Sequence, residues 1–267
     1  MSEPVVKAII GGTALVAAVF LVRGLRQTRE EWGYSSTFFL AFALIFDLPT
    51  LFAALAGNKY LVIDKFGTAA LQGDENYAFT IAAKAVMCAL ALCLAARQIA
   101  RDRNIYLSTG PLMLFLAALV AILANGWQGR AVADPDGLGI LVVFGACCLI
   151  RGGRAVALGA AAYGLCAALL SAAITILRYE ITMLLKCGPL GGLYYGAYNH
   201  ENQFGMLMSL TIPFVYLAFN GHARIVLTSY LALLAWFTGS RTATISALIG
   251  LAVVRRGPDF LPCDHTV

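Results

Sequence analysis

The sequence predicts an all-α membrane protein, a polytopic bundle of about nine transmembrane helices within a range of about eight to ten. The chain has 267 residues and is 60% hydrophobic but only 12% charged, about half the charged share of a soluble domain. Most of such a surface must face lipid, where every backbone polar group has to be paired internally, so only helices or closed barrels remain. The apolar runs, such as 112–124 and 155–177, are long and unbroken, unlike the short alternating strands of barrels.

Each predicted span is an apolar run, and crossing a bilayer takes about 20 residues. The runs lie at 5–22, 37–56, 78–97, 106–124, 137–150, 155–177, 204–220, 224–238 and 241–254. The fifth, eighth and ninth are short. No internal repeat or low-complexity linker divides the chain, so we expect one integral membrane domain over 1–267 that ends in a short polar tail, 257–267.

Basic residues predict the orientation, because Lys and Arg gather in cytoplasmic loops. An outside N-terminus and an inside C-terminus place at least one Arg in every inside loop. The inside residues are then Arg23, Arg26, Arg29, Arg97, Arg101, Arg103, Arg151, Arg154, Arg224, Arg255 and Arg256, and most acids, with Lys59, Lys65, Arg130, Arg178, Lys186 and Arg241, fall outside. The first run is followed by arginines, the reverse of a signal peptide, so we expect a span there and no cleaved leader.

Charge and cysteines exclude other classes. The net charge is +5, but the basic residues flank apolar runs, so we expect no nucleic-acid partner. Of seven cysteines, most lie inside apolar runs, and no disulfide framework or metal motif is visible. We predict no metal and no other cofactor.

One face of the sixth predicted span carries only small residues. Ala160, Gly164, Ala168 and Ala172 recur every four residues, a spacing that lets helix backbones approach closely. We expect close packing within the bundle, with self-association of two copies as the alternative.

The longest polar interruption on the predicted outer side is 178–203. It contains the pairs Gly188-Pro189 and Gly191-Gly192, a group of tyrosines at Tyr194, Tyr195 and Tyr198, and the tetrad Asn199-His200-Glu201-Asn202 just before an apolar span. Tyrosines are common at membrane interfaces, and Asn is a good helix cap. An aromatic belt and a cap are therefore structural alternatives to a substrate site.

Three ionisable residues lie within or beside apolar runs, where charge usually has a function. Arg241, in Gly239-Ser240-Arg241-Thr242-Ala243, either snorkels to headgroups or presents its planar donors to a phosphorylated lipid. Asp47, close to Pro49, and Lys84 lie in the second and third spans. They form either a stabilising pair or a proton or transport pathway.

Two segments resemble motifs of the O-antigen ligase/polymerase superfamily. Residues 196–205 read GAYNHENQFG, which resembles the family's G-x-[FY]-x-[NH]-x-N-x-x-[AG]. Gly196, Tyr198, His200, Asn202 and Gly205 match, and Glu201 stands where the family often has proline. Ser240-Arg241-Thr242-Ala243 resembles its S-R-[GT]-A, and the motif-bearing core covers about 178–254.

The resemblance implies a glycosyltransferase of the cytoplasmic membrane. It would transfer or polymerise a glycan from an undecaprenyl-diphosphate-linked donor at the outer face, with membrane lipid and envelope-assembly proteins around it. His200 or Glu201 would act as general base, and fixed cations would stabilise the diphosphate leaving group. We expect the donor to contact Arg241, Arg178, Lys186, Asn199, Asn202, Tyr198 and Ser240.

Family members are usually longer, with a histidine-bearing outer loop beyond the second motif, whereas this sequence ends at Val267 with His265 predicted inside. The resemblance therefore predicts a truncated, split or divergent member. Two other hypotheses are a transporter or flippase using Asp47 and Lys84, although no transporter-like repeat is visible, and a non-catalytic partner in envelope polysaccharide assembly.

Overall fold

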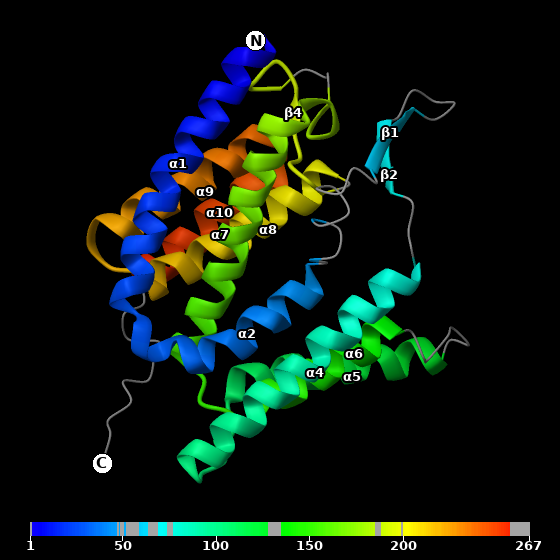
Figure 1. Ribbon diagram of the computed structural model, residues 1–267, viewed down its shortest axis with the longest axis vertical. Coiled ribbons are helices and arrows are strands. Elements are labelled where there is room, and N and C mark those ends of the chain that lie inside the picture. The colour runs from blue at the N-terminus through cyan, green and yellow to red at the C-terminus, as the bar shows by residue number, and fades with distance from the viewer. Residues whose placement is uncertain are drawn as a thin grey trace. The chain divides into compact units, whose positions relative to one another are not determined.

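The fold is mostly helical. A computed structural model describes residues 2–46, 48, 51, 59–63, 69–73, 77–127, 135–184, 188–198 and 200–256. Its α-helices are α1 (Glu3–Gln27), α2 (Trp32–Ile45), α4 (Tyr77–Asp102), α5 (Thr109–Trp127), α6 (Pro135–Cys148), α7 (Arg154–Leu177), α8 (Glu201–Ala218), α9 (Gly221–Phe237) and α10 (Arg241–Arg256) (Figure 1). Each overlaps one predicted span in the same order.

Two short antiparallel hairpins interrupt the helices. The first pairs β1 (Lys59–Ile63) with β2 (Ala69–Gly73), and the second pairs β3 (Met183–Leu184) with β4 (Leu193–Tyr194). Single turns of 3₁₀ helix occur at η1 (Arg29–Glu31) and η2 (Tyr179–Ile181). None of these elements was predicted.

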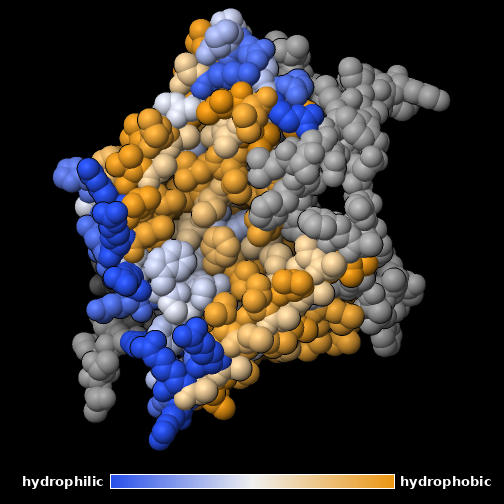
Figure 2. Space-filling model, viewed as in Figure 1, coloured by the Kyte–Doolittle hydropathy of each residue, from blue (hydrophilic) through white to orange (hydrophobic). Residues whose placement is uncertain are grey.

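Several helices are suited to a membrane. Among the described residues, 3 are long and apolar enough to cross one: α1, the part of α4 at Ile81–Asp102, and α7. Shorter apolar helices cover Thr109–Ala124, Leu138–Cys148 and Arg241–Ala252. The space-filling view shows hydrophobic residues over the middle of α1 and hydrophilic residues at both its ends (Figure 2). The count of about nine spans stays a prediction.

The chain forms two compact units. Unit 1 comprises Met1–Gln27, Thr50–Asp74 and Gly164–Val267, and unit 2 comprises Thr28–Pro49 and Glu75–Tyr163. Helix α7 is continuous, so its first ten residues belong to unit 2 and the rest to unit 1. The whole motif-bearing core lies in unit 1. The prediction of one integral membrane domain stays a prediction.

Unit 1 is built by close helix packing. Helix α1 buries Val6, Ile10, Ala14, Ala17 and Leu21, spaced by three or four residues, and packs against α9. Helix α8 packs against α9 and α10.

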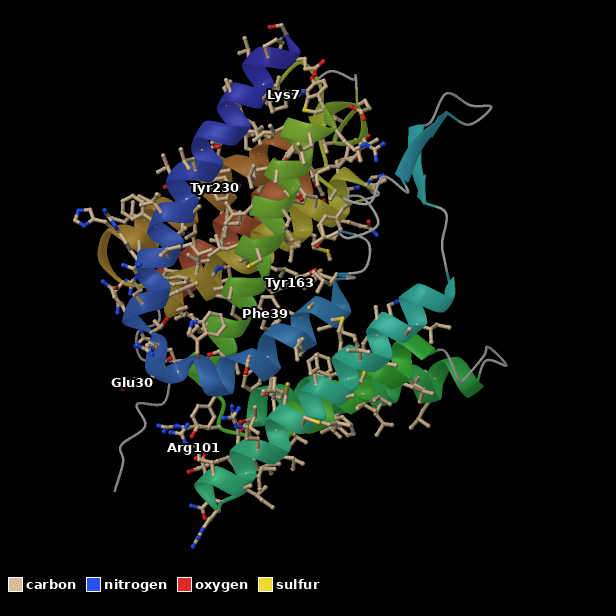
Figure 3. The ribbon with its side chains drawn as sticks, in the orientation of Figure 1. Lys7, Glu30, Phe39, Arg101, Tyr163 and Tyr230 are labelled. Atoms are coloured by element: carbon tan, nitrogen blue, oxygen red, sulfur yellow. The ribbon has the colours of Figure 1, made fainter. Side chains whose placement is uncertain are left out.

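The small-residue face of α7 packs as predicted. Ala160, Ala168 and Ala172 are buried, and a Cβ at Gly164 would collide with the side chain of Thr211. Across from this face, the hydroxyl of Tyr230 (Figure 3) donates to the Ala168 carbonyl at 3.4 Å. Close packing within the bundle accounts for the whole stripe, with no second copy needed.

Unit 2 packs α2, α4, α5 and α6 with the start of α7. Phe39 and Tyr163 meet edge to face with ring centroids 5.7 Å apart (Figure 3), and the Tyr163 hydroxyl donates to the Phe46 carbonyl at 2.9 Å. A Cβ at Gly159 would lie 2.6 Å from the Ser35 carbonyl oxygen, so α2 and α7 touch through their backbones there.

One end of unit 2 collects three connections. The Tyr34 hydroxyl donates to Asp102 at 2.6 Å, Arg154 pairs with Glu31 at 3.4 Å, and Ser108 donates to the Ile150 carbonyl at 2.5 Å. The start of α2, the α4–α5 connection and the α6–α7 connection therefore share one end. The arginines in these three connections predicted that all three lie on the inner side of the membrane.

The connections between helices of unit 1 also lie at two different ends of that unit. Burial raises the pKa of Tyr179, the neighbouring Glu3 carboxylate adds to the rise and Lys7 opposes it, so the start of α1 lies near the end of α7. A Cβ at Gly24 would lie 2.5 Å from Phe219, which brings the end of α1 to the α8–α9 connection. Which side of a membrane each of these ends faces stays a prediction.

Candidate functional site

The two motifs are packed against each other where α8 and α10 begin. A Cβ at Gly205 would lie 2.8 Å from the Ala243 Cβ and 2.9 Å from the Thr238 hydroxyl. Ser209 donates to the Ala243 carbonyl at 2.6 Å. The glycine and the alanine are thus the small residues that allow the first turns of two helices to touch, and both helices present their N-termini at the same end of unit 1.

Helix α8 is capped by His200. This residue is extended (φ −147°, ψ 143°), and its Nδ1 accepts a hydrogen bond from the Asn202 N–H at 3.1 Å. The predicted cap by an asparagine is thus replaced by a histidine cap. Glu201 Oε2 also lies 3.3 Å from Nδ1, but a protonated Nδ1 would lose the cap.

This cap constrains the predicted base. The Nδ1 atom of His200 accepts a hydrogen bond from the α8 backbone, so a proton taken up at Nδ1 would displace that cap. The side chain of Glu201 does not cap a helix. Its side chain is 23% exposed, and it lies in the first turn of α8, where the helix dipole favours the carboxylate.

Helix α10 is capped by Ser240. Its Oγ accepts from the Ala243 N–H at 3.3 Å, and its own N–H donates to the Thr238 hydroxyl at 3.2 Å. Ser240 is only 7% exposed, so its hydroxyl serves the fold, and its predicted donor contact stays a prediction. Arg241, the first residue of α10, is exposed.

The loop ahead of α8 is folded tightly onto unit 1. Gly196 adopts φ +57°, and a Cβ there would lie 2.7 Å from Ser171. The Tyr194 and Thr175 hydroxyls are hydrogen-bonded at 3.1 Å. Tyr198 packs on Phe204 with ring centroids 5.9 Å apart. Tyr194, Tyr195 and Tyr198 are buried within the protein, so the interpretation of these three residues as an aromatic belt at the membrane interface is wrong. Tyr198 has no exposed ring face for the donor contact predicted for it, which remains a prediction.

Two buried polar atoms of this loop have no partner among the described residues: the Tyr195 hydroxyl and Arg178 Nη1. Burial, followed by the nearby Glu201 carboxylate, raises the pKa of Tyr195 to about 12. The Nε–H of Arg178 donates a hydrogen bond to Glu180 Oε1 at 3.3 Å. No sequence pattern distinguishes Tyr195 from Tyr194 and Tyr198 or indicates that its hydroxyl lacks a partner.

Of the remaining predicted residues, the structure places only Asn202 at this site. Asn202 is exposed in the first turn of α8. Lys186, Asn199 and Asp47 lie outside the described residues, so the Asp47–Lys84 pair cannot be described. Lys84 is half-buried in α4, in unit 2.

The arrangement suits an anion. A helix start carries partial positive charge, and two such starts meet here with Arg241 exposed beside them, although the His200 and Ser240 side chains already accept from the Asn202 and Ala243 N–H groups. Within the described ranges, no group of three or more His, Cys, Asp and Glu could hold a metal ion.

The chain was compared with protein families, curated proteins and solved structures. No family model, no curated protein and no solved structure matched it. The family resemblance therefore depends on the residues of the two motifs.

Proposed function

We propose that this chain spans the cytoplasmic membrane about nine times and transfers or polymerises a glycan from an undecaprenyl-diphosphate-linked donor at the outer face. The supporting observation is the contact of Gly205 with Ala243 and Ser240. Glu201 begins α8 and the exposed Arg241 begins α10, so this contact supports placing both residues at the same end of unit 1.

The ends of the helices support the orientation. In unit 2 the connections that carry Arg29, Arg101, Arg103, Arg151 and Arg154 share one end. The same alternation puts the α8 and α10 starts outside. Helix α8 has 18 residues, about 27 Å of helix, close to the bilayer core of about 30 Å. Helix α6 has 14, about 21 Å, and requires a locally thinned bilayer or flanking residues that snorkel.

The chemistry follows from the charges. As the bond between the sugar carbon and the diphosphate oxygen breaks, negative charge grows on the leaving group. Arg241 and the two helix starts stabilise that charge, and removal of one such donor commonly lowers the rate about 10²–10³-fold. The acceptor oxygen forms the new glycosidic bond and gives its proton to Glu201, the carboxylate with no capping duty.

The first experiment replaces Arg241 in the source strain. Arg241→Ala should reduce glycan attachment or chain length about 10²-fold, and Arg241→Lys should restore part of it, because an ammonium keeps the charge but loses the paired donors. Arg101→Ala, an exposed arginine of unit 2, is the matched control. Unchanged glycan in a well-expressed Arg241→Ala strain would remove the role.

The second experiment tests the shared face. In a background without native cysteines, Asn202→Cys and Thr242→Cys should both react with a membrane-impermeant maleimide added outside intact cells. His222→Cys, at the other end of unit 1, should stay unlabelled until the cells are opened. Labelling of only one of the first two from outside would contradict the proposal.

One observation favours a second candidate. Gly196, His200, Gly205, Ser240 and Ala243 all have structural duties as turns, caps or close contacts. A non-catalytic partner in envelope assembly would retain them without chemistry. It would tolerate loss of Arg241 and keep its stability.

A further inference from the structure

A second polar site lies at the end of unit 1 where α8 finishes. A cleft of about 460 Å³ is lined by the end of α1 and the start of α9: Phe20, Arg23, Gln27, Asn220, Gly221, His222 and Ala223. Its volume is within the range of small-ligand sites, about 300–1,000 Å³. None of the residues discussed above as a donor-binding group lines it.

The walls of this cleft are fixed by contacts around it. Gly24 abuts the ring of Phe219, with no room for a Cβ. Arg224 donates from Nε to the Phe219 carbonyl at 2.7 Å and from Nη2 to Asn220 Oδ1 at 2.8 Å. Its guanidinium also lies 4.5 Å from the centroid of the Tyr216 ring. The turn into α9 is therefore held before any ligand arrives.

The described residues that line the cleft include an arginine and a histidine and no carboxylate. Arg23 stands over the Phe20 ring at 5.6 Å, which orients its guanidinium, and His222 is exposed beside it. Among the seven described residues that line the cleft, none is acidic. The first backbone N–H groups of α9 add to this, because Asn220 makes no capping hydrogen bond with its side chain. A basic wall of this kind fits a phosphate.

The depth of the cleft indicates where the phosphate comes from. Val16 and Val19 of α1 and Ile225 of α9 are 50%, 45% and 65% exposed, as expected of side chains that face lipid. Val19 precedes Arg23 by four residues, about 6 Å along the helix. The cleft thus begins where the lipid-facing surface ends, at the level of headgroups.

We propose that this cleft binds the phosphate of an anionic phospholipid headgroup in the cytoplasmic leaflet, with Arg23 as the main contact and His222 as the second. The inference rests on the membrane orientation of the proposed function but not on glycan transfer. Loss of activity at Arg241 would leave it intact.

The test uses the full chain, purified in detergent and stripped of lipid, with short-chain phosphatidylglycerol and phosphatidylcholine as probes in native mass spectrometry. Phosphatidylglycerol should bind more tightly. Arg23→Gln should weaken it about fivefold, the equivalent of about 1 kcal/mol per arginine at a membrane surface, and His222→Ala, which removes a hydrogen-bond donor, should weaken it by a similar factor. Arg26→Gln removes the same charge from the same end of α1 outside the cleft and should have little effect.

Three results would overturn the assignment. Equal binding of the two lipids would remove the need for an anion. Equal weakening by Arg23→Gln and Arg26→Gln would indicate diffuse attraction and no site. Displacement of the lipid by glycerol phosphate at the same concentration would identify a soluble phosphate as the ligand. Arg23→Lys, which should retain most binding, checks that the arginine variants fold.

Discussion

Replacing Gly205 with alanine tests the contact between the α8 and α10 starts. An added Cβ would lie 2.8 Å from the Ala243 Cβ, too close for two carbon atoms, so one helix has to shift. Alanine is better than glycine inside a helix by about 1 kcal/mol, whereas overpacking costs about 1–3 kcal/mol. The variant should lose about 0–2 kcal/mol of unfolding free energy, and α8 should move relative to Arg241.

Gly12→Ala is the matched control, because a Cβ at Gly12 in α1 meets nothing within 4 Å. It should gain up to about 1 kcal/mol. Thermal unfolding in detergent should rank Gly12→Ala above the wild type and Gly205→Ala below it. Glycan transfer should fall further than stability in Gly205→Ala, since a misplacement of about 1 Å can reduce a rate about 10²-fold. If Gly205→Ala matches Gly12→Ala in melting and the wild type in transfer, the contact has neither role.

Two further predictions concern the loop ahead of α8. His200→Asn should keep the cap and the stability, whereas His200→Ala should lose about 1 kcal/mol in thermal unfolding; equal melting would remove the cap. The pKa of Tyr195 is about 12 in the folded protein and near 10 in the unfolded chain. The contribution of Tyr195 to the free energy of unfolding is therefore fully present below about pH 10 and is lost as the pH rises through the folded pKa. Tyr195→Phe should flatten that alkaline loss and, by removing an unpaired hydroxyl, stabilise the protein at neutral pH by about 1–3 kcal/mol; an unchanged alkaline profile would contradict the burial.

The positions of the helices could be predicted from the sequence. The run 155–177 predicted α7 to within one residue of its start, because a long apolar segment in lipid has to pair its backbone internally. The β3–β4 hairpin was not predicted, since two-residue strands carry no periodic pattern. The end of the second predicted span lies largely outside the described residues.

The roles of individual site residues could not be read from the sequence. Ser240 was expected to contact the donor, but its hydroxyl caps α10. Capping and substrate binding use the same hydrogen-bond chemistry, and only packing separates them. The cleft between α1 and α9 was missed because Arg23 and His222 are far apart in sequence and neither belongs to a motif.

The discontinuity of unit 1 has a consequence for biosynthesis. Helix α1 packs on α9, so the ribosome must translate most of the chain before that partner exists. Unit 2 can assemble as soon as residue 163 has been translated, since all its segments precede that point. Until α9 has been translated, the face of α1 that α9 will cover has no partner, and helix α7, shared by both units, joins the early assembly to the late one.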